Sequence, residues 1–102
     1  MVKKVNDLAD AKAAKVAVVD FSAVWCGPCK MLGPVMEQIS EEMPEAEFYN
    51  IDVDEAQKEA EEFSVMSIPL LVVLKDGKEV ARQVGFQPKD SVKAFIQDAM
   101  NK

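Results

Sequence analysis

Cys26 and Cys29 are the only thiols in this 102-residue chain, and two residues separate them. Cysteines with this spacing on one helical turn lie close enough to close a short disulfide and to open it again. The chain contains no histidine, so it cannot build a Ser-His-Asp or Cys-His catalytic arrangement. The chemistry that these residues allow is thiol–disulfide exchange.

The two cysteines are too few for a structural zinc site, which usually needs four nitrogen or sulfur ligands. Only a dimer that pooled four cysteines would hold zinc or an iron–sulfur cluster, and such sites normally take their ligands from one chain. We therefore expect no metal and no bound cofactor other than the redox-active disulfide. The alternative is that both cysteines are merely structural residues of the core.

The elements on either side of the cysteines give them different roles. Residues 16–23 are almost wholly apolar and predict a central strand covered on both faces. Pro28 suits the first position of a following helix, which places Cys26 just before that helix, facing its free amides. A thiolate is stabilised there, so Cys26 is expected to attack a disulfide. Cys29, one turn further and expected to be more buried, is then the resolving thiol.

The helix that follows is predicted by apolar residues at three- and four-residue spacing: Leu32, Met36, Ile39 and Met43. Pro34 lies inside it and should kink it near Lys30, and Pro44 should end it. This strand-CxxC-helix context, in a chain with no other cysteine, favours a redox role over a structural one.

The rest of the chain alternates strands with helices. Strands are predicted at residues 2–5, 47–53, 70–74 and 79–84, and further helices at 7–14, at 54–63 and after Pro88. Asn6 is the expected N-cap of the helix at 7–14, and Asp54 is the expected N-cap of the helix at 54–63. Gln57 is placed to form a capping box with Asp54. Asp76-Gly77 between two apolar runs predicts an antiparallel hairpin. The order βαβαβαββα predicts an α/β fold with a mixed sheet between helices.

The amino-acid composition limits the classes of molecule that this chain is expected to bind. With 12 basic and 18 acidic residues the net charge is -6, which disfavours nucleic acid and anionic lipid. No apolar stretch approaches the ~18 residues of a membrane span, and residues 1–10 lack the apolar block of a signal peptide. We expect one cytoplasmic domain, residues 1–102, that is a monomer without contact to membranes.

Many of these residues resemble the thioredoxin family in order and spacing, over nearly the whole chain. The CxxC element alone would also suit glutaredoxins, disulfide isomerases and oxidases of the same fold. Gly27-Pro28 between the cysteines, with Trp25 and Lys30 on either side, is the thioredoxin form. The likeness extends to residues 19–21, Pro34, residues 50–55, residues 67–69, Asp76-Gly77 and Val84-Gly85.

Asp20 is the next candidate, because a carboxyl in an apolar strand should be desolvated and its pKa raised. From the residues alone, Asp20 and Ser22 also fit a polar strand face that is open to water. The resemblance favours the first interpretation and implies that Asp20 relays a proton from Cys29. Asn50 stands where the common bacterial pattern has lysine, so the relay has a hydrogen-bond donor but no charge at this position.

The resemblance also implies a substrate groove. Trp25 would lie on its rim, although a large aromatic is also a natural core residue. Pro69 would follow a cis peptide bond and leave the backbone of Ile68 free to pair with an extended substrate segment. Gly85 would keep the adjoining wall low.

By the same resemblance, the chain would reduce disulfides in other proteins and be reduced again by a thioredoxin reductase, fed by NADPH or linked to ferredoxin. Two alternatives remain open. A thiol oxidase or isomerase would need an unusually stabilised reduced form and normally an oxidising compartment. A subunit of a larger assembly could grip a partner with the same surface without turnover.

Overall fold

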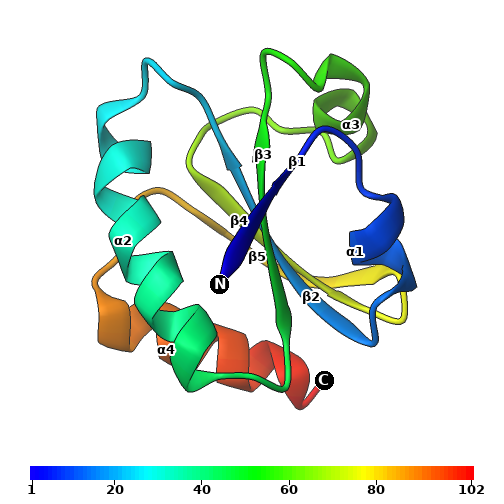
Figure 1. Cartoon of the computed structure of the whole chain (residues 1–102), viewed down its shortest axis with the longest axis vertical. Coiled ribbons are helices and arrows are strands. Elements are labelled where there is room, and N and C mark those ends of the chain that lie inside the picture. Colours follow the sequence, from blue (N-terminus) through cyan, green and yellow to red (C-terminus); the bar gives the residue numbers. More distant parts are fainter.

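Five strands form one sheet, and four helices cover its two faces (Figure 1). The structure is a computed structural model and describes all 102 residues. The observed order confirms the predicted βαβαβαββα arrangement and the α/β class. The strands are β1 (Val2–Val5), β2 (Val16–Ser22), β3 (Glu47–Asp52), β4 (Leu70–Lys75) and β5 (Lys78–Val84). The helices are α1 (Ala9–Ala13), α2 (Gly27–Glu42), α3 (Gln57–Glu62) and α4 (Lys89–Met100).

The strands lie in the order β1-β3-β2-β4-β5, with β2 at the centre. β1, β3 and β2 are parallel, because the helical connections α1 and α2 carry the chain back before each new strand begins. β4 runs antiparallel to β2, and β5 antiparallel to β4. The mixed sheet and its antiparallel edge hairpin are therefore confirmed.

β2 is covered on both faces, as its nearly continuous apolar sequence predicts. Val16 and Val18 belong to a core cluster that includes residues of α2 and α4. Val19 and Phe21 belong to a second cluster on the other face, beside α1 and α3. Because side chains alternate along a strand, Asp20 shares the face of Val16 and Val18 and lies under α2.

α2 confirms the apolar stripe that the sequence predicts. Leu32, Met36 and Ile39 are buried against the sheet, and the helix ends at Glu42, two residues before Pro44. Pro34 lies inside the helix, and a kink near Lys30 stays a prediction. None of the four helices combines the length and the apolar character that crossing a membrane requires.

The predicted cap of α1 is wrong. The helix begins at Ala9, and Asn6 does not cap it. Asp7 instead accepts the Ala9 N–H at its Oδ1, at 3.0 Å. Asp7 therefore takes the amide that was expected to bind Asn6, because an aspartate readily accepts an N–H two residues further along the chain.

The predicted cap of α3 is also wrong. Asp52, at the end of β3, accepts the backbone N–H groups of Asp54 and Glu55 at its Oδ1, at 2.7 and 3.3 Å. This local turn delays the helix to Gln57 and leaves Asp54 outside it. The Gln57 side chain donates to the Asp54 carbonyl at 3.3 Å instead of accepting its N–H, so no capping box forms.

The hairpin between β4 and β5 confirms the Asp76-Gly77 turn. Both residues have positive φ, +52° and +82°, as a two-residue type I′ turn requires. Gly77 also packs closely on the last turn of α1, since a Cβ atom built there would lie 2.9 Å from the Lys12 carbonyl oxygen. Glycine is thus required here by both conformation and space.

Replacing Gly77 by Ala should destabilise the fold by about 1 to 3 kcal/mol, because the new Cβ meets both a strained φ and a backbone oxygen. Gly33→Ala is the matched control, since Gly33 lies within α2 and its Cβ would meet nothing within 4 Å. That change should be neutral or stabilise by about 0.5 to 1 kcal/mol. Urea unfolding of both variants tests the prediction, which equal stabilities would contradict.

Candidate active site

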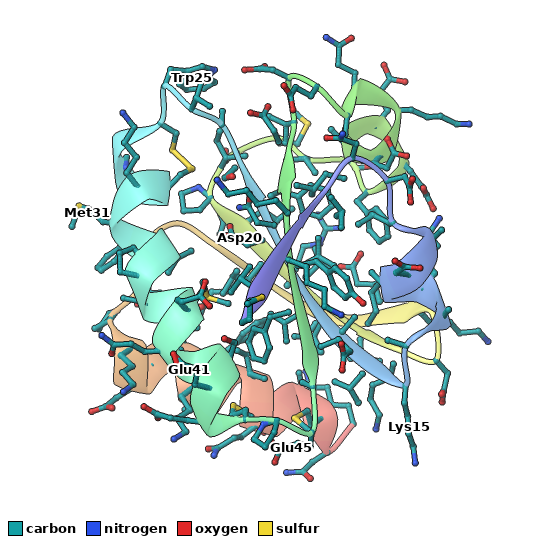
Figure 2. The ribbon with its side chains drawn as sticks, viewed as in Figure 1. Lys15, Asp20, Trp25, Met31, Glu41 and Glu45 are labelled. Atoms are coloured by element: carbon teal, nitrogen blue, oxygen red, sulfur yellow. A yellow bond between two sulfur atoms is a disulfide. The ribbon has the colours of Figure 1, made fainter.

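Cys26 and Cys29 form a disulfide at the N-terminus of α2, with their Cα atoms 5.3 Å apart. Figure 2 shows this bond at the start of the helix that follows β2. Cys26 is the N-cap residue, and its Sγ accepts the Cys29 N–H at 3.2 Å. The predicted placement of Cys26 against the helix amides is confirmed. Charge that develops on its sulfur is therefore stabilised by a backbone donor and by the helix dipole.

Two details of the motif differ from the sequence prediction. α2 begins at Gly27, so Pro28 is the second helical residue and not the first. Proline is tolerated at the second position as well, because the backbone amide there has no hydrogen-bond partner within the helix. The cysteines are equally buried, with exposed fractions of 5% and 6%. The expected greater burial of Cys29 is absent in the disulfide form, since the bond holds both sulfurs together at the same surface.

Trp25 lies on the surface beside the disulfide, with 68% of its area exposed (Figure 2). The alternative that it is a core aromatic is therefore wrong. Its Nε1–H donates to Asp54 Oδ2 at 2.7 Å, which ties the indole to the turn before α3. Sequence reasoning treated Asp54 only as a helix cap and missed this contact, because the two residues are 29 positions apart.

Asp20 is buried, with an exposed fraction of 2%, so the interpretation of a face open to water is wrong. Burial raises the pKa of Asp20 from its usual 3.8 to about 6, and a hydrogen bond from Asn50 opposes this rise. The Asn50 Nδ2 lies 3.3 Å from Asp20 Oδ2 and 2.9 Å from Ser22 Oγ. The second carboxyl oxygen, Oδ1, has no hydrogen-bond partner.

The loop before β4 lies against the cysteines. Ile68 packs on the small cluster formed by Ala23, Cys26 and Cys29, and the Ile68-Pro69 peptide bond is cis, as the resemblance implies. The backbone N–H and C=O of Ile68 form no backbone hydrogen bond, which leaves both groups available to an extended segment.

Gly85 closes the other side of this loop. Its N–H donates to the Pro69 carbonyl at 2.8 Å, and its φ is +89°. A Cβ atom there would meet nothing within 4 Å, so a side chain would project into open space above the loop. Glycine is favoured here by conformation, and its lack of a side chain keeps this wall low.

Three exposed apolar side chains extend this surface. Met66 is 91% exposed in the loop before Ile68, while Val24 and Val84 are exposed beside Trp25 and Gly85. Lys30 is also exposed, next to Cys29. Only their exposure distinguishes these residues from the apolar residues of the core, since the residue types are the same in both places. No group of three or more His, Cys, Asp or Glu side chains is placed to hold a metal ion.

Comparisons with known proteins agree with this geometry. The model of the family described as Thioredoxin matches residues 3–98. The chain is 48% identical to the thioredoxin of Chlamydia trachomatis over 91 residues, 89% of each chain. It is 47% identical to thioredoxin-1 of Saccharomyces cerevisiae over 85 residues, 83% of this chain and 82% of that one. A solved thioredoxin structure from Plasmodium falciparum superposes with a TM-score of 0.89 at 32% identity, covering 95% and 98% of the two chains.

Replacing Asp20 by Asn should stabilise the protein at neutral pH. The folded-state pKa lies above the unfolded value, so the destabilising charge appears as pH rises from about 3.8 through about 6 and is complete above that. At 1.36 kcal/mol per pH unit, this difference corresponds to about 3 kcal/mol.

Unfolding free energies of both proteins between pH 3 and 8, a range that includes the usual and the raised carboxyl pKa, test this prediction. Asp98→Asn makes the same change at an exposed position of α4 and is the matched control. A gain from Asp20→Asn that is constant across the range would contradict the prediction.

Proposed function

Because this chain belongs to the thioredoxin family, we propose that it is a general protein disulfide reductase supplied with electrons by a thioredoxin reductase. Members of the family are protein-disulfide oxidoreductases, and this chain carries out thiol–disulfide exchange through its redox-active Cys26–Cys29 pair. The observation that carries the proposal is the placement of Cys26 Sγ at the N-terminus of α2, where it accepts the Cys29 N–H.

The first step is attack by the Cys26 thiolate on one sulfur of a substrate disulfide. A bond forms between Cys26 Sγ and that sulfur, and the other substrate sulfur leaves as a thiolate with the bonding electron pair. The helix amides and dipole lower the cost of holding Cys26 as a thiolate before the attack.

The second step releases the substrate. Cys29 gives its proton to Asp20 and attacks Cys26 Sγ, the bond from Cys26 to the substrate breaks, and the second substrate sulfur leaves as a thiolate. Asp20 suits this task because burial raises its pKa to about 6. At neutral pH it is then mostly a carboxylate, and it is a stronger base than an ordinary aspartate. Asn50 orients the carboxylate with a hydrogen bond but adds no charge.

Substrate binds on the groove of Trp25, Ile68, Pro69 and Gly85. The unpaired backbone of Ile68 would pair with an extended segment, as an added strand pairs with a sheet edge. Trp25, fixed by Asp54, and the exposed apolar side chains nearby would cover the segment. Gly27 and Pro28 shape the turn between the cysteines, and Lys30 places a positive charge beside Cys29.

The reaction leaves the protein oxidised, so it must be reduced again in each cycle. The proposed donor is a thioredoxin reductase fed by NADPH, and a ferredoxin-linked reductase is the second candidate. A reductase of this kind works in a reducing compartment, which supports a cytoplasmic location. We further propose that residues 1–102 form one domain with no bound cofactor, and that self-repulsion at a net charge of -6 favours a monomer.

The equilibrium redox potential against glutathione separates a reductase from the alternatives. A reductase gives a potential clearly below that of the glutathione pool, whereas an oxidase or isomerase gives a higher one. A chain that only grips a partner would bind equally well with both cysteines changed to serine.

The reduced protein should reduce an accessible protein disulfide, and Cys26→Ser should abolish this activity because it removes the attacking thiolate. Cys29→Ser should instead trap a mixed disulfide through Cys26, because nothing resolves it. Non-reducing gels and intact mass spectrometry measure both outcomes. A Cys26→Ser variant that cross-links to substrate, with a Cys29→Ser variant that does not, would mean that the two roles are reversed.

A further inference from the structure

A row of three polar side chains crosses the sheet beneath α2. Lys4 of β1 pairs in register with Asn50 of β3, and Asn50 pairs in register with Asp20 of β2. Register partners on neighbouring strands present their side chains on the same face of a sheet. The residues two positions earlier on these strands pack into the core under α2 and α4: Val2, Phe48 and Val18. The polar row therefore lies on the α2 side of the sheet, where Figure 2 labels Asp20.

A hollow of about 270 Å³ opens beside this row. Lys4, Asn50 and Asp20 line it from the sheet, and Gly33 and Glu37 line it from α2. The absence of a side chain at Gly33 helps to keep this space open. Asp20 is therefore covered by protein on most sides but has one polar opening, towards the edge strand β1.

A second hollow of about 280 Å³ lies between two residues of this row, Lys4 and Asn50, and Cys29. Cys29 and Ser22 line it, and so do Lys4 and Asn50, which line the first hollow as well. Lys4 thus borders both the space beside Asp20 and the space beside the resolving thiol.

The Asp20 carboxyl has an incomplete set of hydrogen bonds. Oδ2 accepts from Asn50 Nδ2 at 3.3 Å, and Oδ1 is buried without a partner. The same Nδ2 lies 3.3 Å from the Asp20 carbonyl and 2.9 Å from Ser22 Oγ. An amide nitrogen has only two hydrogens, so Asp20 shares this donor. An ionised Asp20 would gain from a second, charged donor.

Few charged groups face Asp20. Leu71 is its partner on β4, and in the first hollow the charged side chains are Lys4 from β1 and Glu37 from α2. Glu37 is already engaged, because its Oε1 accepts the Val2 N–H at 3.1 Å and lies 3.9 Å from the Met1 amino group. Lys30, Asp52 and Glu55 line the second hollow, on the side of Cys29.

Lys4 is the uncommitted positive charge of the first hollow, since its Nζ forms none of the ion pairs or side-chain hydrogen bonds of this structure. Its Cα lies two strand spacings, about 10 Å, from that of Asp20. The side chain is exposed and has a flexible four-carbon stem, so its ammonium can turn into the hollow towards Oδ1.

We propose that Lys4 is a positioning residue for the proton transfer from Cys29 to Asp20, in that its ammonium enters the hollow and pairs with the ionised carboxylate. This inference rests on the proposed function and deepens its second step. There the Cys29 S–H proton moves to Asp20, Cys29 bonds to Cys26 Sγ, and the substrate sulfur leaves with the electron pair of the broken bond. Lys4 favours the carboxylate, which is the form of Asp20 that accepts the proton, and touches none of the reacting atoms.

Lys4→Met removes the charge and keeps an unbranched side chain. It should raise the pKa of Asp20 by about one pH unit, the lower end of the effect of an opposite charge within about 4 to 6 Å. Carboxyl-carbon NMR of Asp20 measures this directly. The acid limb of the resolving rate, followed by stopped flow, should move to higher pH by the same amount. Lys4→Arg should retain the parent values, and Lys4→Gln gives the same readout as Lys4→Met if the Met variant fails to fold.

Lys3→Met is the matched control. Lys3 is the neighbouring lysine on the opposite face of β1, with its Nζ 3.3 Å from Glu47 Oε1 and 5.9 Å from the centre of the Tyr49 ring. The Lys3→Met substitution removes one positive charge, as Lys4→Met does, and should leave the titration of Asp20 unchanged. Equal shifts from Lys3→Met and Lys4→Met would overturn the proposal, because they would reflect net charge alone.

Trapping in the Cys29→Ser background separates this inference from the proposed function. Absence of any mixed disulfide there, with Lys4 intact, would refute the proposed function itself. Normal trapping, combined with an Asp20 that titrates identically in the parent and in Lys4→Met, would refute the role of Lys4 alone. Normal trapping with the shift confined to the Lys4→Met and Lys4→Gln variants supports both.

Discussion

Burial of β2 on both faces is the constraint from which the site follows. Neighbouring strands occupy both edges of β2, and core clusters cover its two faces, so its position is fixed by the whole domain. Its carboxyl end leads directly to Cys26 at the start of α2. The same burial surrounds Asp20 and raises its pKa to about 6. One strand therefore sets the place of the thiol and the proton affinity of the carboxyl behind it.

Periodicity predicted most of the fold because burial determines it. Leu32, Met36 and Ile39 are buried only if the residues around them form a helix that packs on the sheet. The apolar run of β2 is buried only if the strand is covered on both faces. Helix starts were less predictable, since several neighbouring side chains compete for the same amides. Asp7 accepts an amide that was assigned to Asn6, and Asp52 takes the place predicted for Asp54. These hydrogen bonds join residues only two or three positions apart, and the spacing of apolar residues does not predict them.

The site was predictable where it is local and less so where it depends on contacts across the chain. Cys26 is at the helix end because strand, motif and helix follow one another directly. The face on which Asp20 lies could not be decided from β2 alone, because α2 covers that face only through packing. The contact from Trp25 to Asp54 and the row from Lys4 to Asp20 join residues that the sequence separates and only the sheet register brings together.

The two faces of the sheet contribute unequally to the chemistry. The face beside α1 and α3 is a continuous apolar cluster, whereas the face under α2 is interrupted by Asp20 and Asn50. A carboxyl fully sealed in the core would stay neutral and accept no proton, while one in water would titrate near 3.8 and be a weak base towards a thiol. The hollow under α2 holds Asp20 between these limits, because it removes most of the water and still leaves a polar opening. The edge position of β1 makes this opening possible, since a sixth strand beside β1 would close it. Asp20 is the one charged residue among the buried side chains, so only its ionisation destabilises the core. Burial of the apolar cluster on the same face offsets this loss of stability.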